Sequence, residues 1–102
     1  DTSKATGVCF QRSRIRTQDI TDGLSNTYLA GEKYVSSKHY QDDDDMGYDQ
    51  SMFNGVDLDI NRWTIDPPLR DTDAFFERRF RSAHPGVCLF LLCDGSLRDV
   101  AF

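Results

Sequence analysis

The stretch with the most concentrated ligand chemistry is rich in aspartate. Seven aspartates lie between Ser36 and Asn61, namely Asp42, Asp43, Asp44, Asp45, Asp49, Asp57 and Asp59. Ca²⁺ takes about six to eight oxygen ligands, and flexible Asp-rich loops can supply them. The run DDDDMGYDQ lacks the alternating ligands and terminal Glu of an EF-hand loop, and adjacent carboxylates repel one another. Three alternatives follow for the 42–59 loop: a solvated segment, a partner-binding patch, or a calcium site at Asp43, Asp45 and Asp49.

His84 and Asp94 form a second combination of residue types that catalysis uses, because an aspartate can orient an imidazole. These two residues bracket one predicted strand, and the ten steps of chain between them span roughly 30 Å when extended. They therefore cannot form a dyad within one molecule. We expect Asp94 to be a turn residue beside Gly95. We expect His84 to hydrogen-bond backbone at the start of the strand, in preference to acting as a metal ligand or a base.

Glu32 and His39 are the other candidates. Glu32 falls in the middle of a predicted strand, so its carboxylate is exposed, paired with an arginine or backbone group, or functional. His39 stands beside the acidic run and could ligate a metal with Asp42 and Asp43, although a single histidine in a polar loop is more commonly solvated. A hydrolase is a third possible class of function, and it requires the side chains of Glu32, His39 and His84 to lie close together in the fold. No phosphate-binding loop, zinc-ligand spacing or dinucleotide fingerprint occurs.

The C-terminal residues 84–102 must position several of these groups. Residues 87–93 are an uncharged apolar run, Asp94-Gly95 is the signature of a two-residue type I′ turn, and residues 96–101 return as a second strand. A two-residue loop places Leu92 opposite Leu97 and Val87 opposite Phe102. Both faces of that hairpin are apolar, so strand 87–93 is predicted to be central and covered on both sides.

Residues 27–35 predict another strand, since aromatic and β-branched residues dominate it. Gly31 within it indicates a bulge or a close backbone approach. Residues 61–65 predict a short strand that ends at Asp66-Pro67-Pro68, with a loop over 66–73.

The remaining segments carry weaker patterns. Residues 7–10 predict a short strand, and residues 11–16, where arginines alternate with other residues, fit an edge strand. Residues 17–23 predict one helical turn capped by Thr17. Residues 73–80 fit either a helical turn or an irregular segment.

These elements together predict an α+β fold. It is a small, mostly antiparallel β-sheet domain with long loops and little helix, and its C-terminal β-hairpin is central. With 102 residues, the chain is expected to be a single domain over 1–102.

Composition excludes some functions. A net charge of −5 and a pI near 4.8 argue against nucleic-acid binding, which needs surplus Lys and Arg. No apolar run approaches the ~18 residues of a transmembrane helix.

The three cysteines allow at most one disulfide. Cys88 and Cys93 are roughly 16 Å apart on one strand, too far for a disulfide. Cys9 could pair with either of them, or all three are small buried hydrophobes.

An ordered set of motifs resembles one bacterial family. His84, nine further residues and then Asp94-Gly95 match the H-X9-DG signature. The other matching segments, in chain order, are RI at 14–15, DITDGLSNT at 19–27, GEKYV at 31–35, the Asp-rich stretch before Arg62-Trp63, and FRSAHPG at 80–86. This set is similar to the DUF1559 family of prepilin-type processing-associated H-X9-DG domain proteins. Arg81 departs from the glycine common in the family's FGSAHPG, which bears on the tightness of that turn.

The resemblance implies a non-enzymatic, extracytoplasmic domain of a pseudopilin-like protein, located in the periplasm or cell envelope or secreted. It implies a full-length protein with a prepilin-like leader and an N-terminal hydrophobic helix, which would be its membrane contact. It also implies protein partners in a pilus-like or type II secretion assembly, with a homo-oligomer as one form. The motif residues carried over are His84, Asp94, Gly95, Glu32, Asp22 and Gly23. No cofactor is expected apart from a possible calcium ion. The alternative function is a calcium-dependent module that binds carbohydrate or peptide through the 42–59 loop.

Overall fold

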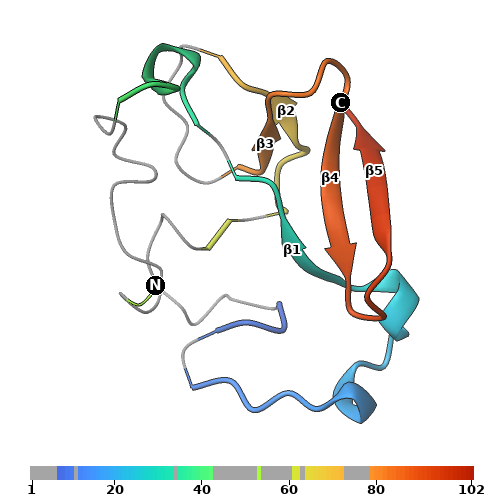
Figure 1. Ribbon diagram of the computed structural model, residues 1–102. Helices are drawn as coiled ribbons and strands as arrows, with labels where there is room; N and C mark the ends of the chain where they lie inside the picture. The colour runs from blue at the N-terminus through green and yellow to red at the C-terminus, as the bar shows by residue number, and fades with distance from the viewer. Residues whose placement is uncertain are drawn as a thin grey trace.

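The computed structural model describes residues 7–10, 12–33, 35–42, 53, 61–62, 64–72 and 79–102 (Figure 1). These residues form short 3₁₀ helices and five strands. In chain order the elements are η2 (Thr17–Asp19), η3 (Leu24–Asn26), β1 (Tyr28–Gly31), η4 (Ser37–His39), β2 (Leu69–Arg70), β3 (Arg81–Ser82), β4 (Val87–Leu92) and β5 (Leu97–Ala101).

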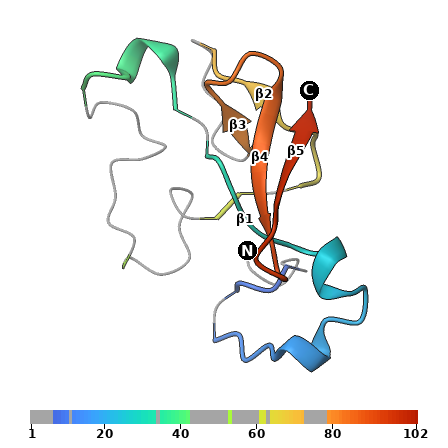
Figure 2. The same ribbon diagram turned by 45° about the vertical axis from the view of Figure 1, so that its right-hand side comes forward.

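The main sheet has the order β1-β4-β5, and both of its strand pairs are antiparallel. β2 and β3 form a separate parallel pair, which lies beside the start of β4 in both ribbon views (Figures 1 and 2). The predicted fold class is confirmed: a small, mostly antiparallel β-sheet domain with long loops and little helix, in which the C-terminal hairpin is central.

β4 is central because every second side chain on it is apolar and buried. Cys88, Phe90 and Leu92 are at most 3% exposed. The Phe90 ring lies 4.5 Å from the ring of Tyr28 and 4.9 Å from that of Phe80, measured between centroids. Such tilted and edge-on ring pairs add to the free energy gained by burial.

The opposite face of β4 is less covered. Its side chains Val87, Leu89 and Leu91 are only half-buried. The prediction that β4 is central is therefore right, whereas the prediction of full cover holds for one face.

The hairpin register differs by one residue from the prediction. Leu91 faces Leu97 and Val87 faces Ala101, where the sequence predicted Leu92 opposite Leu97 and Val87 opposite Phe102. The cause is the turn. The Gly95 N–H donates to the Leu92 carbonyl at 3.0 Å, and Gly95 has φ +86° while Asp94 does not have positive φ. A three-residue loop with glycine in the left-handed region replaces the type I′ turn. Leu97 consequently moves to the half-buried face.

Gly31 allows two aromatic rings to approach the backbone of β1. A Cβ added to Gly31 would lie 2.7 Å from Phe90 ring carbons and 2.8 Å from a Phe80 ring carbon. The predicted close approach is correct. The register shift falls between Tyr28 and Ala30, so the bulge precedes Gly31.

Several short elements were wrongly predicted. The described residues of 61–65 contain no strand, and β2 begins only after Pro67-Pro68, inside the stretch predicted as loop. Proline lacks the N–H that a ladder needs, so pairing starts beyond it. The described residues of 7–16 contain no strand either, because a turn joins Phe10 to Ser13 and Arg12 has φ +62°.

The predicted helical turn is present as η2, although Arg16 occupies the cap position in place of Thr17. Strand 27–35 is shorter than predicted, because β1 ends at Gly31. Among the described residues beyond it, the Glu32 N–H still donates to the Leu89 carbonyl, and an isolated bridge pairs Lys33 with Phe80. Of the segment 73–80, residues 73–78 lie outside the described residues.

We expect Gly31→Ala to destabilise the fold by about 1–3 kcal/mol, since a new methyl group must displace two packed rings. Urea unfolding followed by tyrosine fluorescence measures the change. Gly7→Ala is the matched control, because a Cβ at Gly7 meets nothing within 4 Å. Equal stability of the two variants would contradict the packing described for Phe80 and Phe90.

Candidate functional site

Glu32 stands where β1 leaves the main sheet. Its backbone N–H donates to the Leu89 carbonyl at 3.2 Å, which continues the β1–β4 ladder, but its carbonyl accepts the Arg81 N–H at 3.3 Å. The carboxylate takes over the role of the carbonyl toward β4, since Oε2 accepts the Leu89 N–H at 2.8 Å. A mid-strand glutamate is thereby satisfied by backbone, one of the alternatives that the sequence allowed.

His84 completes this arrangement. Its Nε2 lies 3.1 Å from Oε1 of Glu32, and both side chains are partly exposed. Its backbone N–H donates to the Ser82 hydroxyl, and its carbonyl accepts the Gly86 N–H. The imidazole thus contacts a carboxylate, whereas the sequence predicted a backbone partner. We call the Glu32 carboxylate with its contacts to Leu89 and His84 the Glu32 clasp.

Asp94 lies at the other end of β4 and has different partners. Its Oδ1 accepts the Ser96 hydroxyl at 2.6 Å and the Ser96 N–H at 2.9 Å. These hydrogen bonds lower the pKa of Asp94. The expectation that His84 and Asp94 do not cooperate agrees with this, because each is engaged at its own end of the strand.

Asp22 and Gly23 shape the segment that is hydrogen-bonded to the hairpin turn. Gly23, with φ +93°, precedes η3, and its carbonyl accepts the Thr27 hydroxyl at 3.0 Å. The Asp22 carbonyl accepts the Asn26 side-chain amide at 3.0 Å. The segment so shaped presents two carbonyls to the turn: Thr27 accepts the Cys93 N–H at 2.9 Å, and Leu24 accepts the Asp94 N–H at 3.1 Å.

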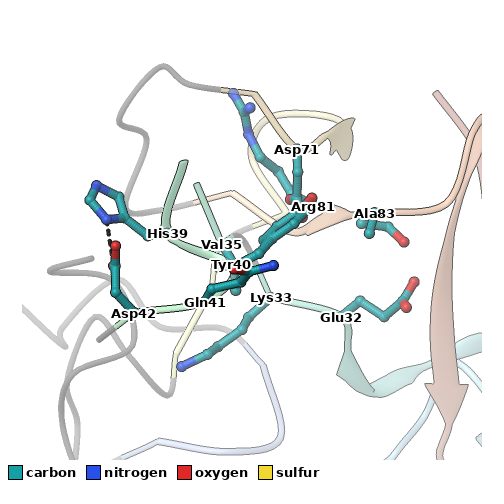
Figure 3. Close-up of a pocket in the computed structure, with 11 residues that line it drawn as sticks. Glu32, Lys33, Val35, His39, Tyr40, Gln41, Asp42, Asp71, Arg81 and Ala83 are labelled. Carbon is teal, nitrogen blue, oxygen red and sulfur yellow. Dashed lines mark hydrogen bonds and ion pairs between the residues drawn. The ribbon is translucent and has the colours of Figure 1, made fainter. Parts of the chain in front are cut away.

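A cavity of about 620 Å³ opens beside the Glu32 clasp (Figure 3). It is lined by residues that follow β1, by η4 and the residues after it, by the residue that follows β2, and by β3 and the residue after it. The lining residues are Glu32, Lys33, Val35, His39, Tyr40, Gln41, Asp42, Asp71, Arg81, Ser82 and Ala83. The walls therefore mix acidic and basic side chains.

His39 and Glu32 lie on opposite sides of this cavity (Figure 3). His39 Nδ1 lies 2.7 Å from Oδ1 of Asp42. The structure thus pairs His39 with Asp42, the first aspartate of the acidic run, and pairs Glu32 with His84. Glu32, His39 and His84, the three residues of the hydrolase alternative, therefore do not form one cluster: Glu32 contacts His84, and His39 contacts Asp42.

Asp71 and Tyr40 form the polar centre of the cavity. The Tyr40 hydroxyl donates to Oδ2 of Asp71 at 2.9 Å. Burial raises the pKa of Asp71, an effect that the Tyr40 hydrogen bond and the Arg81 charge partly offset. Burial, together with the Asp71 carboxylate, also raises the pKa of Tyr40.

Arg81 is buried, with 1% of its surface exposed. Its Nη1 donates to the Arg70 carbonyl at 3.1 Å and to the Thr72 hydroxyl at 2.8 Å. Sequence reasoning placed Arg81 in a turn and missed Asp71 and Tyr40 altogether. No local pattern distinguishes a buried arginine from a surface one, and the Tyr40–Asp71 contact joins residues 31 positions apart.

The calcium prediction cannot be placed on the structure. Asp43, Asp45 and Asp49 lie outside the described residues, as does nearly all of the 42–59 loop. Within the described part, no group of three or more His, Cys, Asp or Glu side chains is arranged to hold a metal ion.

All three cysteines are free thiols. Cys88 is buried, and burial together with the nearby Glu32 charge raises its pKa to about 11, so it stays a neutral thiol. Cys9 is exposed, which corrects the alternative of three buried cysteines, and neither predicted disulfide partner is bonded to it.

The chain belongs to the family described as a protein of unknown function, DUF1559, whose model matches residues 1–101. This small antiparallel domain with its clasp and braced hairpin is therefore a member of that family, as the motifs predicted. No curated protein and no solved structure matches the chain. In the described segments, no helix has the length and apolar character needed to cross a bilayer.

The Glu32 clasp predicts an ordering of variants. Glu32→Ala leaves the Leu89 N–H without its acceptor and should cost about 2 kcal/mol of unfolding free energy. Glu32→Gln keeps an acceptor oxygen and should cost less. His84→Ala removes only a partly exposed pair and should cost about 0.5 kcal/mol. Urea titration of the three variants tests the order, and a His84→Ala loss larger than that of Glu32→Ala would refute it.

Asp71 predicts a pH effect. A raised pKa means that folding favours the protonated carboxyl, so this contribution to stability is complete below the unfolded value of 3.8 and is lost as pH rises through the raised folded value. Asp71→Asn removes that loss. Relative to wild type, the variant should therefore gain stability as pH rises from about 3 to 7. Thermal unfolding across this range, with Asp99→Asn as control, checks the sign, and a parallel pair of curves would contradict it.

Proposed function

We propose that this chain is an extracytoplasmic cell-envelope domain of a pseudopilin-like protein that acts through assembly or ligand contact and not through catalysis. Family membership supports the proposal, because the H-X9-DG motif accompanies prepilin-type processing. The domain would then be held at the envelope by a hydrophobic N-terminal helix of the full-length protein, with protein partners in a pilus-like or secretion assembly.

The observation that carries the proposal is the engagement of the motif side chains. Glu32 is tied to Leu89 and His84, and Asp94 is tied to Ser96. A catalytic acid, base or nucleophile must reach a substrate atom. Residues whose oxygens already accept backbone and side-chain hydrogen bonds within the fold suit a scaffold better than a reaction centre.

Processing of the full-length product tests the proposal. We expect co-expression with a prepilin peptidase to shorten its N-terminus, as read by mass spectrometry, and to leave the mature protein in the envelope fraction. A peptidase with an inactivated active site is the control. An intact N-terminus together with recovery in the cytosolic fraction would refute the proposal.

The calcium-dependent module remains the alternative, and it rests on the acidic run alone. Calorimetric titration of the purified domain with CaCl₂ separates the two functions. Binding heat that disappears in Asp43→Ala and Asp45→Ala, but persists in the β5 control Asp99→Ala, favours the module. Absence of binding heat in wild type favours the assembly function.

A further inference from the structure

The outer edge of β5 carries backbone groups that have no hydrogen-bond partner among the described residues. On the inner side, the Leu92 N–H donates to the Ser96 carbonyl at 2.8 Å and the Phe102 N–H donates to the Gly86 carbonyl at 3.1 Å. Alternate residues of an antiparallel strand bond to the same neighbour. The N–H and C=O groups of Leu97, Asp99 and Ala101 therefore point away from β4.

This edge is open to solvent. Four of the five β5 residues are exposed, and Leu97 has 72% of its surface exposed. Within the described ranges, β5 pairs with β4 alone, and in Figure 1 the side of β5 away from β4 has no labelled element. An exposed strand edge of this kind is a template for pairing with another strand.

We propose that the occupant of this edge is β5 of a second copy, paired antiparallel about a two-fold axis that passes between the two Val100 residues. The inference does not depend on the proposed cellular role, because it concerns the domain itself. A two-fold axis normal to the sheet requires outward-facing residues of one copy to pair with outward-facing residues of the other. Only a few registers meet that requirement.

Centring the axis on Leu97 or on Ala101 would pair only that one outward-facing residue within β5. Charge disfavours two further registers. Centring the axis on Asp99 places the two Asp99 side chains opposite one another, and centring it on Arg98 opposes two arginines. Like charges in directly opposed positions destabilise a strand pair. The Val100 register avoids both, since Arg98 then faces Phe102 of the second copy and Asp99 faces Ala101.

The Val100 register adds favourable contacts. Arg98 Nη2 donates to the Ser25 carbonyl at 3.3 Å, so what Arg98 offers the second copy is its aliphatic stem, which can cover the Phe102 ring. Phe102 is 42% exposed in the single chain. The two Asp99–Ala101 pairs supply about four backbone hydrogen bonds. The two Asp99 side chains remain diagonal neighbours and repel weakly. Because the paired segment is short, we expect a weak dimer, with a Kd on the order of 0.1–1 mM.

Sedimentation equilibrium of the purified domain from about 10 μM to about 1 mM tests the proposal. Wild type should show a monomer–dimer equilibrium. Ala101→Pro removes an outward N–H that the single chain does not use, so the chain should fold while association weakens about tenfold or more. Asp99→Asn relieves the diagonal repulsion and should tighten association severalfold.

Leu97→Ser is the decisive control. In the Val100 register Leu97 lies beyond the paired residues, so the variant should associate as wild type does. General hydrophobic adhesion would instead fail in Leu97→Ser, because Leu97 is the most exposed apolar side chain of β5. A monomeric wild type at about 1 mM, or association that Leu97→Ser abolishes and Ala101→Pro leaves intact, would overturn the proposal.

Discussion

The fold depends on a single carboxylate that serves as a ladder acceptor. β1 must pair with β4 up to Gly31 and then turn toward Phe80 and Arg81, and at that fork the backbone carbonyl of Glu32 can face only one neighbour. It faces Arg81, which leaves the Leu89 N–H of the central strand without a backbone partner. The Glu32 side chain supplies the acceptor. A buried strand cannot leave such a donor unpaired without a cost of about 1–3 kcal/mol.

The family motif can be understood as the two ends of one strand. His84 lies before β4 and contacts the Glu32 clasp, and Asp94 and Gly95 lie after it in the hairpin turn. The nine intervening residues hold the six of β4. The spacing is therefore set by the length of the strand and its turns. The second motif segment, around Gly23, belongs to the turn end, where it braces the hairpin through the Thr27 carbonyl.

Long-range order could be predicted from sequence where pattern alone dictates it. The uncharged run 87–93 identified the central strand, and the mid-strand Gly31 indicated close packing. The hairpin register could not be predicted, because Asp-Gly fits both a two-residue turn and a three-residue loop with a left-handed glycine. β2 and β3 could not be predicted either, because strands of two residues are too short to show an alternating hydrophobic pattern in the sequence. The contacts of Arg81, Asp71 and Tyr40 depend on the fold as a whole.

Amide exchange at Leu89 tests the central claim most directly. In wild type the Leu89 N–H should be protected by the Glu32 carboxylate. In Glu32→Ala its exchange should accelerate by at least an order of magnitude, while the Leu92 N–H, which donates to Ser96, keeps its protection as an internal reference. Rapid exchange at Leu89 in wild type, or equal protection in both proteins, would contradict the account.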